Sequence, residues 1–296
     1  MILSKNPLWQ FSRPHTMIGT TLSVLGILGV FLAETQRISD SVLWVLGIAL
    51  VSCLLANVYI VGLNQLTDVA IDRINKPYLP LAQGTLQPEQ ARWIVGVCGG
   101  VALGLALLQG GFLWGTVLVS ILIGTAYSLP PLRLKRFSGW ASLCILVVRG
   151  VVVNLGLYGY FAQALAPSVI WPPRLLALTV FMVIFGIVIA LFKDIPDTVG
   201  DKLNNIQTLS VQWGRTVVFR LCIVFLVLDY LGLMAFGLGT TFWSPAGIVL
   251  LIASHVLLLG WLGYQSRTVS QFTEFYQFIW RLFYLEYLLF PLTCLL

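Results

Sequence analysis

Residues 175–205 read LLALTVFMVIFGIVIALFKDIPDTVGDKLNN, an uncharged apolar run that passes directly into an acidic segment. A helix of about 20 apolar residues crosses a hydrocarbon core of about 30 Å, and similar runs recur along the whole chain. We therefore predict an all-α integral membrane protein with nine spanning helices. Their approximate bounds are 15–33, 42–63, 92–109, 112–130, 139–162, 175–193, 216–237, 243–263 and 276–296.

The composition agrees with a membrane protein. The 296 residues are 58% hydrophobic and only 9% charged, whereas a soluble domain has about 25% charged residues. If the N-terminus lies inside, the outer loops hold only two basic residues, Arg37 and Arg174, and the inner side is cytoplasmic. The net charge of +6 then requires no nucleic-acid partner. Residues 1–16 lack a transit-peptide composition, so we expect no leader.

Two acid-rich segments stand at the inner ends of the second and sixth spans. The first acidic segment reads NQLTDVAIDRINKP (64–77), and the second acidic segment reads KDIPDTVGDKLNN (193–205). Their oxygen-bearing side chains follow spacings that place them on one face of a helix continuing out of each span. These residues are Asn64, Asp68 and Asp72 in the first segment and Asp194, Asp197 and Asp201 in the second.

Clustered carboxylates repel one another and favour a bound cation. Ligands that are all oxygen favour Mg²⁺, which usually shares one or two carboxylates with substrate phosphates. We therefore expect two Mg²⁺ ions and a diphosphate between the segments. The alternative is that these acids only solubilise loops. The segments begin 129 positions apart and continue with similar residues, as after an internal duplication, and this repetition favours the functional interpretation.

A basic loop, AYSLPPLRLKRFSG (126–139), follows the fourth span. Arginine binds phosphate oxygens through a planar fork and lysine binds them as a point charge. The loop could hold diphosphate oxygens, or it could only anchor the inner side of the membrane.

Arg149 lies about ten residues into the fifth span, where a lipid-facing charge costs at least about 2.5–3.5 kcal/mol. Its side chain must therefore face a wet or paired interior. One interpretation is an ion pair with Asp229 or Glu286, the acids deep in other spans. The other is a binding site for a substrate carboxylate.

The patterns NQxxDxxxD and KDxxDxxxGD on a chain of nine spans resemble the UbiA superfamily of intramembrane aromatic prenyltransferases. More narrowly, FSRPHT (11–16), YSLPPLRLKRF (127–137) and both acidic segments resemble its homogentisate branch. Many superfamily members have Asp where this chain has Gln65. The glutamine suits the homogentisate branch and argues against chlorophyll synthase.

The resemblance implies one membrane domain over 1–296, with nine helices around a lipid-open cavity and a cytoplasmic cap. It also implies Mg²⁺-dependent transfer of a prenyl group, with phytyl favoured, from a prenyl diphosphate to homogentisate. Decarboxylation gives the methyl-phytyl-benzoquinol of tocopherol biosynthesis, in the plasma or thylakoid membrane of a cyanobacterium-like cell. A solanesyl donor for plastoquinone is the main alternative.

The resemblance also implies roles for particular residues. The six acidic-segment residues would bind metal, and the catalytic set would be Asp68, Asp72, Asp197, Asp201 and Lys135. The diphosphate set would be Arg73, Lys76, Tyr127, Arg133, Lys135, Arg136 and Lys193. The aromatic-acceptor set would be Gln65, Arg149 and Asn154. A transporter is a further alternative, but transporters place their acids near the bilayer midplane.

Overall fold

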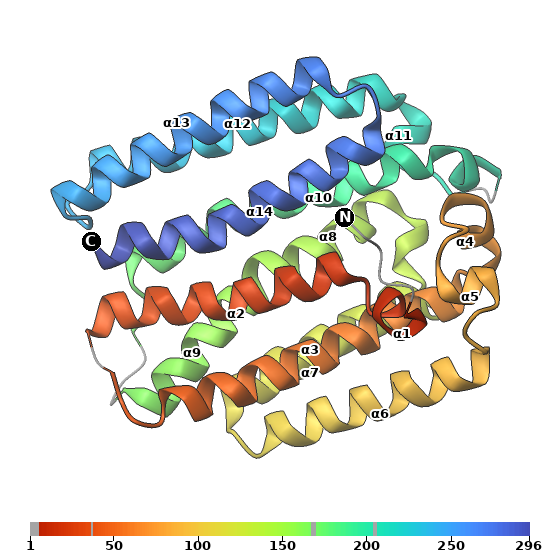
Figure 1. Ribbon diagram of the computed structural model, residues 1–296, viewed down its shortest axis with the longest axis horizontal. Coiled ribbons are helices and arrows are strands. Elements are labelled where there is room, and N and C mark those ends of the chain that lie inside the picture. Colours follow the sequence, from red (N-terminus) through yellow and green to blue (C-terminus); the bar gives the residue numbers. More distant parts are fainter. Residues whose placement is uncertain (1–5, 37, 167–169, 204–205) are drawn as a thin grey trace.

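The computed structural model describes residues 6–36, 38–166, 170–203 and 206–296 (Figure 1). Within this part, nine helices are long and apolar enough to cross a membrane, which confirms the predicted spans. They are α2 (Pro14–Thr35), α3 (Val42–Thr67), α6 (Pro88–Leu107), α7 (Gly111–Ser128), the continuous α8 (Ser138–Leu146), η2 (Val147–Val152) and α9 (Val153–Leu165), α10 (Pro173–Leu203), α12 (Arg215–Gly239), α13 (Pro245–Thr268) and α14 (Phe272–Leu295). Lys5, Arg37, Asn204 and Asn205 lie outside the described residues.

The helix ends differ from the predicted ones where polar residues extend the helix. The sixth span was expected to end at 193, but α10 continues to Leu203 and includes the acids of the second segment. The third span begins earlier than expected, at Pro88, because Gln87 and Gln90 form a capping box in front of it.

Short helices gather at one end of the bundle, opposite the C-terminus (Figure 1). The labelled ones are α1 (Pro7–Phe11), α4 (Val69–Asn75), α5 (Pro80–Gln83) and α11 (Leu209–Gln212). The 3₁₀ turn η1 (Leu134–Arg136) belongs to the basic loop. This end of the bundle corresponds to the expected cap, and it carries both acidic segments.

The spanning helices form a closed ring of contacts. α2 packs on α3, α3 on α7, and α7 on α9; the α8–α9 helix packs on α10, α10 on α14, and α14 returns to α2. α6 lies outside this ring against α3 and α7, while α12 and α13 cover α10 and α14. A site built at the capped end of the ring therefore receives residues from both halves of the chain.

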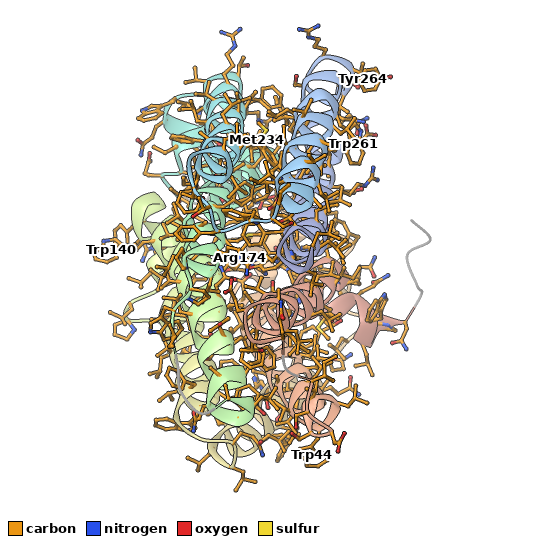
Figure 2. The ribbon with its side chains drawn as sticks, turned by 90° about the vertical axis from the view of Figure 1, so that its left-hand side faces the viewer. Trp44, Trp140, Arg174, Met234, Trp261 and Tyr264 are labelled. Atoms are coloured by element: carbon orange, nitrogen blue, oxygen red, sulfur yellow. The ribbon has the colours of Figure 1, made fainter. Side chains whose placement is uncertain are left out.

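Close helix contacts inside contrast with apolar side chains outside. α2 approaches α14 so closely that a Cβ on Gly26 would lie 2.6 Å from the carbonyl oxygen of Tyr287. Trp44 and Trp140 lie on the outside of the bundle and are 70% and 55% exposed (Figure 2). Exposed indole rings on apolar helices fit a surface that is covered by lipid.

Candidate active site

The first acidic segment does not lie on one continuous helix, which corrects the sequence prediction. α3 ends at Thr67, Asp68 takes a non-helical conformation with φ −116°, and α4 begins at Val69. Asn64 still donates a hydrogen bond from Nδ2 to Asp68 Oδ2 at 3.0 Å. Asp72 follows on α4, with only 5% of its surface exposed. The break lets α4 change direction while Asn64 and Asp68 stay side by side.

The basic loop contacts the first acidic segment directly. Lys135 Nζ lies 2.6 Å from Asp68 Oδ1, and Arg133 Nη2 lies 3.2 Å from the same oxygen. Lys135 also donates to Thr67 Oγ1 at 2.9 Å. Burial lowers the pKa of Lys135, although the Asp68 carboxylate opposes this shift. Arg133 and Lys135 thus both pair with Asp68, so the basic loop does more than anchor the inner side of the membrane.

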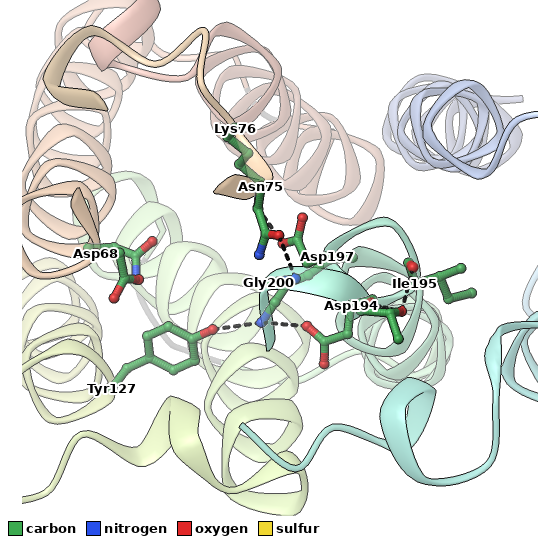
Figure 3. Close-up of polar contacts among 11 residues, drawn as sticks. Asp68, Asn75, Lys76, Tyr127, Asp194, Ile195, Asp197 and Gly200 are labelled. Carbon is green, nitrogen blue, oxygen red and sulfur yellow. Dashed lines mark hydrogen bonds and ion pairs between the residues drawn. The ribbon is translucent and has the colours of Figure 1, made fainter. Parts of the chain in front are cut away.

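The second acidic segment is a continuous part of α10, which includes Pro196 without interruption. Its three acids, Asp194, Asp197 and Asp201, are each less than 10% exposed. Lys193 Nζ lies 3.5 Å from Asp194 Oδ1 and donates to the Tyr127 hydroxyl at 2.6 Å (Figure 3).

The end of α4 joins the two acidic segments. Lys76 forms an ion pair with Asp197, and the Gly200 amide donates to Asn75 Oδ1 at 3.1 Å (Figure 3). Burial disfavours the charged form of Lys76, but the Asp197 carboxylate outweighs it, so the pKa of Lys76 is raised. The segments therefore face each other, as the sequence predicted.

Asp72 lies among the charges of both segments. Burial raises the pKa of Asp72 to about 6, and the carboxylates of Asp68 and Asp197 add to this rise. Arg13 and Lys76 act in the opposite direction. A bound cation would lower the pKa of this carboxyl group, because a cation stabilises the ionised form.

The donor set fits Mg²⁺ that is shared with a substrate. Among the described residues, no three His, Cys, Asp or Glu side chains are grouped closely enough to form a metal cage by themselves. Mg²⁺ usually takes one or two carboxylates and completes its octahedron with phosphate oxygens and waters. Asp68 beside Asn64, and Asp197 across the gap, offer oxygen atoms of this kind from two sides (Figure 3).

Other predicted site residues form no ion pair or hydrogen bond with these acids in the described part of the chain. Arg73 and Arg136 are exposed, and neither forms an ion pair in the described part of the chain. Gln65 donates from Nε2 to the Phe11 carbonyl at 2.7 Å and thereby fixes α1 on α3. Asn154 accepts a 2.7 Å hydrogen bond from the Tyr287 hydroxyl and donates to the Gly150 carbonyl at 2.7 Å. Their roles toward substrates stay predictions.

Arg149 does not form the ion pair considered from the sequence. Glu286 instead lies 3.3 Å from His255 Nε2, and no described carboxylate lies within 4.0 Å of Arg149. The Arg149 guanidinium stands 4.9 Å from the centre of the Trp280 ring and 5.7 Å from that of Phe283. Its charge is therefore held by aromatic faces.

Sequence reasoning missed the residues that position this site. Asn75 and Gly200 connect the segments. The Asn residues that follow both motifs were the available signal for Asn75, and nothing in the sequence pointed to this contact of Gly200. Arg13 had been assigned no role of its own, yet its charge lowers the pKa of both Asp72 and Lys76, against the net rise of each. Its location within FSRPHT, between a short helix and Pro14, was the available signal.

Comparison with known proteins gives results that agree with this geometry. The model of the "UbiA prenyltransferase family" matches residues 22–282. Homogentisate phytyltransferase of Synechocystis sp. is 50% identical over 96% of this chain and 94% of that protein. Homogentisate phytyltransferase 1 of Arabidopsis thaliana is 41% identical over 97% and 75%, respectively. A UbiA homolog from Archaeoglobus fulgidus, bound to GPP and Mg²⁺, is 16% identical and shares the fold, with a TM-score of 0.67 and coverage of 98% and 99%.

Proposed function

This chain belongs to the UbiA prenyltransferase family, and we propose that it is a Mg²⁺-dependent homogentisate phytyltransferase of tocopherol biosynthesis. The observation that carries the proposal is the junction of the two acidic segments by Lys76 and Asp197. It creates one polar site from both halves of a membrane chain. The identity to the Synechocystis enzyme, over nearly the full length of both chains, supports homogentisate and phytyl diphosphate as substrates.

The acidic segments would hold the metal and the diphosphate. Asn64, Asp68 and Asp72 would hold one Mg²⁺, and Asp194, Asp197 and Asp201 a second. Bound Mg²⁺ would neutralise the diphosphate oxygens and thereby favour departure of the leaving group.

The basic side chains supply the remaining charge at the leaving group. Lys76, Lys135 and Lys193 each lie beside a carboxylate of the site, and Tyr127 orients Lys193. Preorganised cations stabilise charge that develops during reaction more than they stabilise the ground state. These lysines would therefore act mainly on the departing diphosphate.

The reaction balances without a further reactant. The allylic C–O bond of phytyl diphosphate breaks, diphosphate leaves with the electron pair, and a ring carbon of homogentisate forms the new C–C bond. The ring proton is lost, and a proton replaces the carboxyl group as CO₂ departs. Burial of the twenty-carbon tail in the membrane favours binding by about 0.8 kcal/mol per CH₂ group.

We also propose an orientation and a domain organisation. The capped end would face the cytoplasm, with the N-terminus inside, because the inner loops are rich in lysine and arginine. The membrane would be a plasma or thylakoid membrane of a cyanobacterium-like cell. Residues 1–296 would form one domain in which the two acidic segments are the trace of a duplication.

The test is an assay of membranes that contain this protein, with labelled homogentisate, Mg²⁺ and either phytyl or solanesyl diphosphate. We expect decarboxylated, phytylated quinol that disappears when EDTA removes Mg²⁺ and returns when Mg²⁺ is added. Membranes from cells without the protein are the control. Preference for solanesyl diphosphate would move the protein to plastoquinone synthesis, and no product with either donor would refute the homogentisate assignment.

A further inference from the structure

Each acidic segment has a lysine bound to its central aspartate. Lys135 Nζ lies 2.6 Å from Asp68 Oδ1, and Lys76 forms an ion pair with Asp197 (Figure 3). The side chains of the first pair are only 9% and 12% exposed, and those of the second are 25% and 13% exposed. Ion pairs with so little contact with water are weakly screened by salt. Both lysines therefore neutralise an acid that is proposed to bind Mg²⁺.

The lysine on Asp68 competes with a metal ion for the same oxygen. Mg²⁺ binds a carboxylate oxygen at about 2.0–2.1 Å, and the ammonium group already lies 2.6 Å from Oδ1. Arg133 Nη2 lies 3.2 Å from this oxygen, and Asn64 donates to Oδ2 at 3.0 Å. Both oxygens of Asp68 are thus engaged by the protein. A metal ion that binds Asp68 must displace the lysine, because two cations this close repel each other strongly.

The charge of the site also limits how much metal it can take without an anion. Its acids are Asp68, Asp72, Asp194, Asp197 and Asp201. The basic side chains that pair with them among the described residues are Lys76, Arg133, Lys135 and Lys193. Five carboxylates thus face four basic groups, so the net charge is close to zero. Mg²⁺ alone would make the site strongly positive, whereas Mg²⁺ that arrives with a diphosphate keeps the balance.

Both lysines can reach an anion between the segments. A lysine carries a point charge on a flexible four-carbon stem, so its Nζ can turn from a carboxylate to a phosphate oxygen. Lys135 also donates to Thr67 Oγ1 at the end of α3, and Lys76 is the residue directly after α4. The buried Nε atom of Arg133 has no hydrogen-bond partner in the described part of the chain, so the basic loop retains a donor for an anion.

We propose that Lys76 and Lys135 are exchangeable counter-ions of Asp197 and Asp68, and that they transfer to the diphosphate of the substrate when Mg²⁺ takes their place. The inference rests on the proposed function and adds a coupling between metal and diphosphate binding. The exchange precedes cleavage of the C–O bond, so both lysines are in position when charge develops on the leaving group. Mg²⁺ alone leaves the displaced lysines without a partner and binds weakly. Each ligand therefore strengthens the binding of the other.

The test measures binding without turnover. Purified protein in detergent is titrated with Mn²⁺, a paramagnetic substitute for Mg²⁺, and free Mn²⁺ is followed by electron paramagnetic resonance. Labelled inorganic pyrophosphate is then titrated at saturating Mn²⁺. In Lys135→Met and Lys76→Met, we expect Mn²⁺ alone to bind about tenfold more tightly than in the wild type, equivalent to about 1.4 kcal/mol. Pyrophosphate should bind at least about tenfold more weakly, because it loses a lysine.

Two controls separate the exchange from a general change of charge. Lys202→Met removes an exposed lysine of α10 that forms no ion pair with any described residue, so both affinities should change less than about twofold. Lys135→Arg keeps a cation that can pair with Asp68, so Mn²⁺ alone should still bind weakly. The thermal unfolding midpoint shows whether each variant folds. Lys76→Met tests the second segment independently if Lys135→Met does not fold.

The outcomes distinguish the exchange from the proposed function. Opposite changes of the two affinities in the lysine variants would support the exchange. Unchanged or weaker binding of Mn²⁺ alone would overturn it, because the lysines would then not compete with the metal. Equal tightening in Lys202→Met would also overturn it, since the effect would not depend on contact with an acid. A wild type that shows the exchange but does not prenylate homogentisate would refute only the acceptor assignment.

Discussion

The two acidic segments contain the same kinds of residues but differ in local structure. The first is broken at Asp68, between α3 and α4, whereas the second continues along α10 through Pro196 to Leu203. The break allows α4 to cross toward α10, where Asn75 and Lys76 make contact with Gly200 and Asp197. The difference teaches that one acidic segment can meet the other on an unbroken helix, while the opposite segment must break at Asp68 to reach it.

The largest expected effect tests whether both segments are equally necessary. Asp68→Asn and Asp197→Asn keep the side-chain volume and remove one negative charge from each segment. We expect each to lower kcat/KM by about 10³-fold, as for the loss of a central electrostatic group. Initial rates over a range of Mg²⁺ concentrations measure the effect, and the thermal unfolding midpoint in detergent shows whether each variant folds.

Unequal losses of kcat/KM in the two variants would show that the two segments have different roles. If Asp68→Asn alone removed activity and Asp197→Asn changed kcat/KM by less than about tenfold, Asp197 would serve mainly as the partner of Lys76. The second metal assignment would then be wrong.

A smaller effect concerns the contact between α4 and α10. A Cβ at position 200 would overlap the amide of Asn75, so Gly200→Ala should displace α4 from the second segment. We expect about a tenfold loss of kcat/KM, although alanine in a helix otherwise stabilises it by up to about 1 kcal/mol. The matched control is Gly96→Ala on α6, where an added Cβ meets no atom within 4 Å. Equal activity of the two variants would contradict the structural role of this contact.

Titration of Asp72 gives a further test of the first segment. Burial raises the pKa of Asp72 to about 6, and only the ionised carboxylate can bind Mg²⁺. Since the protonated fraction increases as pH falls, the Mg²⁺ concentration for half-maximal activity should rise up to about tenfold per pH unit below pH 6. Asp72→Asn should show a flatter dependence. Identical slopes for the wild type and this variant would exclude Asp72 as a ligand.

The smallest expected effect concerns Gln65 of the first segment, which attaches α1 to α3. Gln65→Glu replaces the amide that donates to the Phe11 carbonyl with an acceptor, so α1 should lose its attachment to α3. We expect a loss of about 1–3 kcal/mol of stability, seen as a lower unfolding midpoint, and a few-fold loss of activity. Gln212→Glu is the control, since Gln212 makes a similar but exposed bond to the Gln207 carbonyl. An equal change in both would contradict the anchoring role.

The sequence predicted the features that depend on local composition. Hydropathy located the nine spans, and charge spacing identified the segments that meet through Lys76 and Asp197. The break at Asp68 was not predictable, because it accompanies the docking of α4 on another helix. The surroundings of Arg149 were not predictable either, since Trp280 comes from a helix 131 positions further along the chain.

The π-helical turn Val147–Val152 also sets the rotational phase of the fifth span. In an α-helix, two residues five positions apart point in directions about 140° apart. The wider turn brings such residues close to the same side, since its hydrogen bonds join positions five apart. Both Arg149 and Asn154 can therefore face α14, where they meet Trp280 and Tyr287, respectively. Deletion of one residue from Val147–Val152 would therefore rotate α9 and turn Asn154 away from Tyr287 on α14.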